Sequence, residues 1–169
     1  GDVLSSDYQS WTVASAILEA AERFTQAEHE PALQQFILVS GSLKALAEKR
    51  YDASLILDAY LLRSLGIAGF APSMTTCSKC DEPGPHKYFS LVGGGSVCAT
   101  CKPSASATPS EATLALMSDL LTGNWETAMS SELKNRGEAS GLIAALATST
   151  LALAPSIALA VVGIATIGA

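Results

Sequence analysis

The chain has 169 residues, of which 49% are hydrophobic and 15% charged, and its formal net charge is −6. This length suits one domain with a core of its own, and the acidic balance argues against broad, charge-driven binding of nucleic acids. The Ala- and Leu-rich composition favours helices, because these side chains lose little entropy in a helix. No signal-peptide pattern is present at the start.

Two amphipathic helices are predicted in the first 50 residues. The first covers residues 7–24, with Asp7 as its expected N-cap, and the second covers residues 30–49, with Pro31 in its first turn. The face of the first helix that we expect in the core holds Tyr8, Trp11, Ile17, Leu18 and Ala21. The corresponding face of the second holds Leu33, Phe36, Ile37, Val39 and Leu43.

A third helix is predicted over residues 53–66, introduced by Asp52. It is apolar on nearly every side, so we expect it to be the central and most buried helix. Asp58 and Arg63 are its polar exceptions. If Asp58 is buried it needs a partner, for which the candidates are Arg63, Lys44 or a backbone donor.

All four cysteines lie in a turn-rich segment that follows this helix. Residues 87–101, which include three consecutive glycines, are typical of a β-hairpin, and residues 102–110 are expected to be a flexible exit. A further helix should start at Thr108, as the N-cap of a capping box with Glu111, and end at Gly123. A short helix and a last helix are then expected. The prediction is a mainly α fold, a helical bundle with an inserted module.

The cysteine spacing is typical of a four-cysteine metal site. Cys77 and Cys80 form one Cys-x-x-Cys pair, and Cys98 and Cys101 form the second. Two such knuckles can close a tetrahedron of thiolates around Zn²⁺, which leaves no open position and makes the ion structural. Two disulfides, a redox Cys-x-x-Cys or an iron–sulfur cluster are the alternatives. His86 can replace a ligand, although a turn or surface role is expected for it.

Signals for catalysis are sparse. The two histidines, His29 and His86, are far apart in the sequence, and there is no Gly-x-Ser-x-Gly or His-Glu-x-x-His motif. The glycines at 93–95 lack the strand-to-helix context and the Lys-Ser/Thr pair of a phosphate-binding loop. We therefore do not expect an enzyme.

The motif order resembles the RecO family of bacterial DNA repair proteins, in particular its zinc-containing actinobacterial type. The strongest similarity is the run LDAYLLRSLGIAGFAPSMTTCSKCDEPGPHKYFSLVGGGSVCATC, residues 57–101, and weaker stretches extend it over roughly residues 2–145. The resemblance implies a recombination mediator that binds and anneals DNA, works with RecR and loads recombinase on DNA coated by single-strand-binding protein. It also implies a cytoplasmic, nucleoid-associated protein.

The resemblance assigns this chain to the helical and zinc part of such proteins, without their N-terminal OB-fold. DNA contacts would then depend mainly on the OB-fold, which supplies single-strand binding surface. In the family the helical domain also takes the acidic C-terminal tail of single-strand-binding protein. Such a tail needs a basic rim beside an apolar pocket, and the candidates for that rim are Lys44, Lys49, Arg50 and Arg63. Solvated helix ends are the plainer interpretation of this cluster.

The C-terminal stretch departs from the family, because no charged residue follows Glu138. By length alone the run 142–169 could span a bilayer, but Pro155 interrupts it and no basic flank follows, so a membrane is not the expected partner. A frame-shifted end or a buried helix pair are the other interpretations. The expected organisation is a helical part (1–76), the zinc module (77–102), a second helical part (103–145) and this tail (146–169). The alternative function is a zinc-stabilised helical interaction module, anchored in a membrane by the tail.

Overall fold

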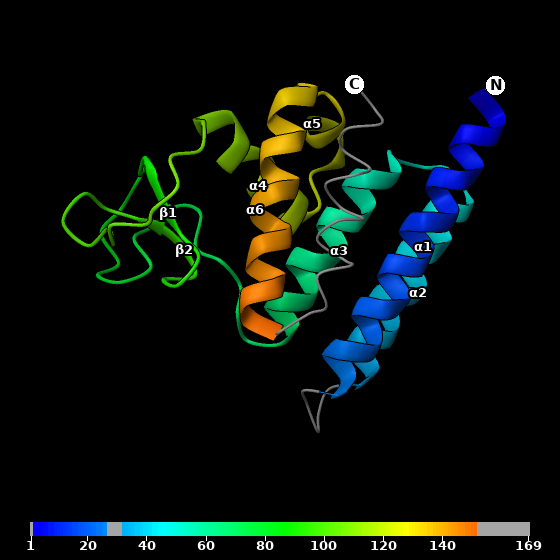
Figure 1. Cartoon of the computed structure of the whole chain (residues 1–169), viewed down its shortest axis with the longest axis horizontal. Coiled ribbons are helices and arrows are strands. Elements are labelled where there is room, and N and C mark those ends of the chain that lie inside the picture. The colour runs from blue at the N-terminus through cyan, green and yellow to red at the C-terminus, as the bar shows by residue number, and fades with distance from the viewer. Residues whose placement is uncertain (1, 27–31, 152–169) are drawn as a thin grey trace.

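The computed structural model describes residues 2–26 and 32–151, and this part of the chain is mainly helical (Figure 1). The predicted fold class, a helical bundle with a small hairpin module, is confirmed. In chain order the elements are α1 (Asp2–Gln26), α2 (Ala32–Ala47), α3 (Ala53–Ile67), β1 (Tyr88–Ser90), β2 (Gly95–Val97), α4 (Glu111–Thr122), α5 (Trp125–Met129) and α6 (Leu133–Leu151).

Helix α3 is the centre of the bundle, as its apolar sequence predicts. It contacts α1 and α2 on one side and α4 and α6 on the other, and ten of its residues are buried. Asp52 is its N-cap, because the carboxylate accepts a hydrogen bond from the backbone N–H of Ser54 at 2.9 Å. A helix that is apolar on every side has no solvent face, so it can only be stable when it is surrounded by other helices.

The predicted core faces of α1 and α2 are partly wrong. In α1 the core is formed by Val13, Ala16, Ile17, Ala20 and Phe24, whereas Tyr8, Trp11 and Leu18 are exposed. In α2 the residues Leu33, Phe36 and Ile37 are exposed as well. Asp7 is not an N-cap, since α1 begins five residues earlier. Pro31 lies outside the described residues. Helical spacing identifies an apolar stripe, but the neighbouring helices decide which stripe is covered.

Asp58 is fully buried, and none of the three expected partners contacts it. Its Oδ2 instead accepts a hydrogen bond from the hydroxyl of Ser140 on α6, and Oδ1 has no partner among the described residues. Burial raises the pKa of Asp58 to about 7; the Ser140 hydrogen bond lowers it, and the nearby Asp52 raises it slightly. The side chain therefore links α3 to α6 at the cost of burying a carboxyl group.

The module between α3 and α4 contains the predicted β-hairpin. Strands β1 and β2 are antiparallel, with Tyr88 opposite Val97 and Ser90 opposite Gly95. The prediction that residues 102–110 form a flexible exit is wrong at Ala107. This residue pairs with Phe89 through two backbone hydrogen bonds of 2.9 Å each. Phe89 itself is buried in the helical core. The hairpin therefore packs directly against the helical bundle through Phe89.

Gly95 provides a sharp test of how this module is packed. Its φ is +146°, and a Cβ at this position would lie 2.4 Å from the carbonyl oxygen of Ser73. We expect Gly95→Ala to destabilise the chain by about 2–4 kcal/mol, because backbone strain and a clash with backbone atoms add together. Urea denaturation would measure the effect. Gly94→Ala is the matched control: its φ of +69° is also left-handed, but a Cβ there has open space, so a loss of only about 1 kcal/mol is expected. Equal losses would contradict this account.

Helix α4 begins two residues later than the predicted capping box requires. Its N-cap is Ser110, not Thr108, and the Ser110 hydroxyl accepts a hydrogen bond from the backbone N–H of Thr113. The predicted end at Gly123 is confirmed, with the left-handed φ of +88° that favours glycine. Helices α5 and α6 follow, as predicted, and α6 continues through Leu151.

The interpretation of the C-terminal tail falls largely outside the described residues, because these end at Leu151. Among the helices that are described, none is both long enough and apolar enough to cross a membrane.

Candidate metal centre

The two Cys-x-x-Cys pairs come from two tight turns on either side of the hairpin. In the first turn the backbone N–H of Cys77 donates to the carbonyl of Glu82, and the N–H of Asp81 donates to the carbonyl of Cys77, both at 2.9 Å. In the second turn the N–H of Lys102 donates to the carbonyl of Cys98 at 3.0 Å. A backbone hydrogen bond from Ser78 to Ser96, at 2.8 Å, holds the first turn against β2.

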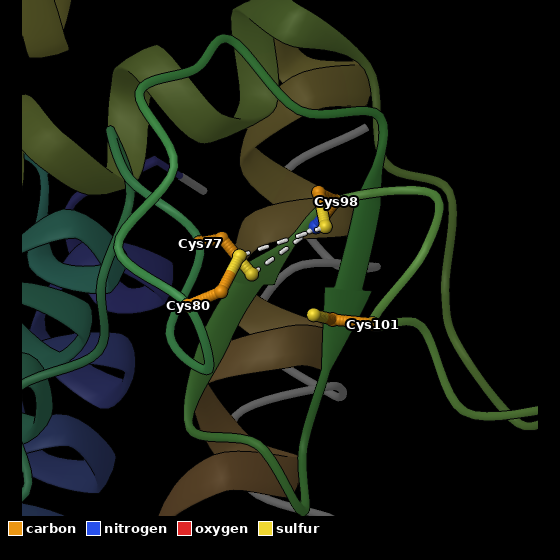
Figure 2. Close-up of side chains that lie close together, drawn as sticks. All are labelled: Cys77, Cys80, Cys98 and Cys101. Atoms are coloured by element: carbon orange, nitrogen blue, oxygen red, sulfur yellow. Dashed lines mark hydrogen bonds between the residues drawn. The ribbon is translucent and has the colours of Figure 1, made fainter.

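These turns bring all four cysteine sulfurs to one place (Figure 2). Their Sγ atoms lie within 4.8 Å of one another, and those of Cys80 and Cys98 are 3.9 Å apart. Sulfurs at the corners of a tetrahedron around one ion, with metal–sulfur bonds of about 2.3 Å, are separated by roughly 3.8 Å. A disulfide would need about 2.0 Å, and all four cysteines are free. The cluster can therefore hold a metal ion, as the spacing predicts.

The electrostatics of the cluster call for a cation. The backbone N–H of Cys98 donates to Cys77 Sγ at 3.4 Å, and this hydrogen bond is the largest cause that lowers the pKa of Cys77 to about 6. Contacts with the sulfurs of Cys98 and Cys80 instead raise the pKa of Cys101 to about 12. One thiolate is thus favoured, but four thiolates so close together repel one another. A bound dication removes this repulsion and keeps all four deprotonated.

His86 does not belong to the cluster. Its Nε2 lies 2.8 Å from the carbonyl oxygen of Glu82, and among the described residues the group that could hold a metal ion consists of the four cysteines. The contact with Glu82 agrees with the turn or surface role that the sequence predicts for His86.

Comparison with known proteins places this arrangement in a family. Residues 5–154 match the model of the C-terminal part of recombination protein O. The DNA repair protein RecO of Thermobifida fusca is 50% identical over 145 residues, which are 86% of this chain and 60% of that protein. The RecO protein of Streptomyces avermitilis is 48% identical over 145 residues, which are 86% of this chain and 58% of that protein. This chain belongs to the RecO family.

The chain spans about 60% of the length of these RecO relatives. Because the match is to the C-terminal part of the RecO family, the helical bundle and the cysteine module correspond to that part. No solved structure matches the chain.

The four cations proposed from the RecO resemblance do not converge on one site. Lys49 pairs with Asp7 at 3.2 Å, Arg50 with Glu48 at 2.5 Å, and Lys44 with Glu48 at 3.9 Å. Such exposed pairs contribute little to stability and leave their charged groups accessible. Arg50 and Arg63 line one pocket between α2, α3 and α5, whereas Lys44 and Lys49 are outside it.

This pocket, of about 340 Å³, has an aromatic wall that the sequence did not reveal. The ring of Trp125 stacks on that of Tyr51, with centroids 4.1 Å apart, and the guanidinium of Arg63 lies 5.5 Å from the centroid of the Trp125 ring. Arg63 also donates from Nε to the carbonyl of Leu120 at 3.1 Å, which fixes its direction. Burial lowers the pKa of Arg63. No local pattern joins Tyr51 to Trp125, because they are distant in the sequence.

Proposed function

We propose that this chain is the helical, metal-binding part of a RecO-type DNA repair and recombination mediator. It would help DNA strand annealing and recombinase loading together with RecR and single-strand-binding protein. DNA would be bound mainly by the OB-fold domain that the family carries in addition to the helical part. The proposal is carried by nearly 50% identity to proteins named DNA repair protein RecO over a stretch that includes the cysteine module. A cytoplasmic location associated with the nucleoid follows from that role.

We further propose that Cys77, Cys80, Cys98 and Cys101 bind one structural Zn²⁺. Zinc prefers four thiolates in a tetrahedron, and structural zinc sites are closed because protein ligands fill every position. A closed site offers no position for water or substrate. The residues described include one histidine, His86, which faces a backbone carbonyl. A non-enzymatic role is therefore proposed.

The pocket of Arg50 and Arg63 is our proposed site for the acidic tail of single-strand-binding protein. Two guanidinium groups beside an apolar, aromatic wall suit a peptide that combines carboxylates with an apolar side chain. Lys44 and Lys49 would act from outside the pocket, by attracting the acidic segment before it binds.

A titration with a fluorescently labelled tail peptide tests this site. We expect Arg50→Glu to weaken binding at least about 10-fold, because it replaces a charge-assisted contact with a repulsive one. Arg50 is preferred to Arg63, whose hydrogen bond to α4 makes it part of the fold. Lys49→Glu is the matched control: it changes the net charge equally but lies outside the pocket, so a loss below about 3-fold is expected. Equal losses, or no binding by the unmodified chain, would contradict the proposed site.

A further inference from the structure

The four cysteines of the cluster differ in how far solvent reaches them. Cys80 is exposed and Cys101 is half-buried, whereas Cys77 and Cys98 are buried. The two buried cysteines form the small core of the module together with Val97, so they lie on its inner side. The cluster therefore has one closed side and one open side, and Cys80 is the cysteine that a small molecule in solution reaches most easily.

An open side matters because metal-bound cysteines remain reactive. The thiolate is the nucleophilic form of cysteine, and a bound dication keeps all four sulfurs in this form. The oxidation of a cysteine by peroxide depends on its thiolate character and its exposure, and it is reversible when a second thiol lies beside the first. Cys80 meets these conditions, because it is exposed and the Sγ of Cys98 lies 3.9 Å from its own Sγ.

We propose that Cys80 is the site at which hydrogen peroxide oxidises the metal-loaded cluster, and that Cys98 is the resolving cysteine. This inference rests on the proposed zinc site. The Cys80 thiolate attacks one oxygen of the peroxide, an S–O bond forms, the O–O bond breaks and hydroxide leaves, which yields a sulfenic acid. The Cys98 thiolate then attacks the Cys80 sulfur, an S–S bond forms and a second hydroxide leaves. Two thiolates are thus oxidised to one disulfide, and one peroxide is reduced to two hydroxide ions.

The disulfide has two consequences for the module. It removes two of the four thiolate ligands, so the ion is released, because zinc is held by thiolates. It also joins the first turn to the second turn across the hairpin, instead of closing either Cys-x-x-Cys pair on itself. Cys77 and Cys101 remain as thiols. Peroxide would therefore empty the metal site while the two turns stay linked, and a reductant with fresh zinc would rebuild it.

The test adds hydrogen peroxide to the zinc-loaded, full 169-residue chain. In the presence of dimedone, which traps sulfenic acids, the adduct at Cys80 should exceed that at Cys77 or Cys98 at least about 10-fold, because exposure governs the first step. Without dimedone, a chromogenic chelator should detect one zinc ion released for each disulfide formed. Peptide mapping under non-reducing conditions should find Cys80 joined to Cys98. Dithiothreitol and added zinc should restore the original metal content.

Met129→Leu is the control, since methionine is the other side chain that peroxide oxidises and Met129 is exposed on α5. It should release zinc at the same rate as the unmodified chain. An adduct mainly at Cys77 or Cys98, a disulfide within one Cys-x-x-Cys pair, or zinc that stays bound after peroxide treatment would overturn the inference alone. A chain that binds no zinc at the outset would contradict the metal site itself, and the inference with it.

Discussion

Removing the metal is expected to unfold residues 77–101 while the helical bundle remains folded. The module has a very small core of its own, formed by Cys77, Val97 and Cys98, with Tyr88 and Cys101 packed against it. Its two strands have three residues each. Phe89 is anchored in the helical core, but the rest of the segment buries too little apolar surface to stay ordered without the ion, whereas zinc binding to four-ligand modules contributes on the order of 10–16 kcal/mol. Hydrogen exchange with and without a chelator would show the loss of protection in 77–101 and its persistence in α3.

Single substitutions sharpen this test. Cys98→Ser should lower the metal content well below one ion per chain, because a hydroxyl is a poor replacement for a thiolate ligand. Thr100→Ser is the matched control, since Thr100 lies within the same turn but is exposed and leaves all four sulfurs in place. The prediction fails if the chain, purified under reducing and metal-replete conditions, contains no zinc. It also fails if chelation leaves the exchange of 77–101 unchanged.

The second large effect is a pH dependence that comes from Asp58. Its pKa of about 7 in the folded chain is far above the 3.8 of a free aspartate, so the folded state binds more protons than the unfolded state between these values. The contribution of Asp58 to the free energy of unfolding must therefore fall as the pH rises from about 4 to about 7. Asp58→Asn keeps the shape and an acceptor for Ser140 but cannot ionise. Above pH 7 it should be more stable than the unmodified chain by about 4 kcal/mol.

Urea denaturation of both proteins across this pH range would measure the difference, in which the pH dependence of metal binding cancels. Ser140→Ala is the complementary variant. Because the Ser140 hydrogen bond holds the pKa of Asp58 down, its loss should extend the decline in stability to higher pH. A stability difference between Asp58→Asn and the unmodified chain that does not vary with pH would contradict the burial of this carboxyl group as an ionisable group.

The features that were predicted correctly depend on residues close together in the sequence. The cysteine spacing, the glycines of the hairpin, the Asp52 cap and the Gly123 stop each act within a few residues, so local stereochemistry decides them. The central position of α3 was also predictable, because a helix without a polar face has only one stable location.

The errors concern which elements pack against each other. An apolar stripe on α1 or α2 looks the same whether it contacts α3 or solvent, so periodicity could not show that Trp11 and Phe36 are exposed. The partner of Asp58 comes from α6, far along the chain. Likewise, Arg50 and Arg63 line one pocket while Lys44 and Lys49 lie outside it, a grouping that depends on how α2, α3 and α5 pack together.

The position of the cysteine module in the chain has a consequence for the entropy of folding. Residues 68–110 form one long excursion between α3 and α4, two helices that contact each other directly. Closing so long a loop restricts the chain, and the restriction grows with the logarithm of loop length. An ion held by the four sulfurs, together with the pairing of Phe89 and Ala107, divides this excursion into short closed segments. An ion bound there would favour the contact of α4 with α3 without touching either helix.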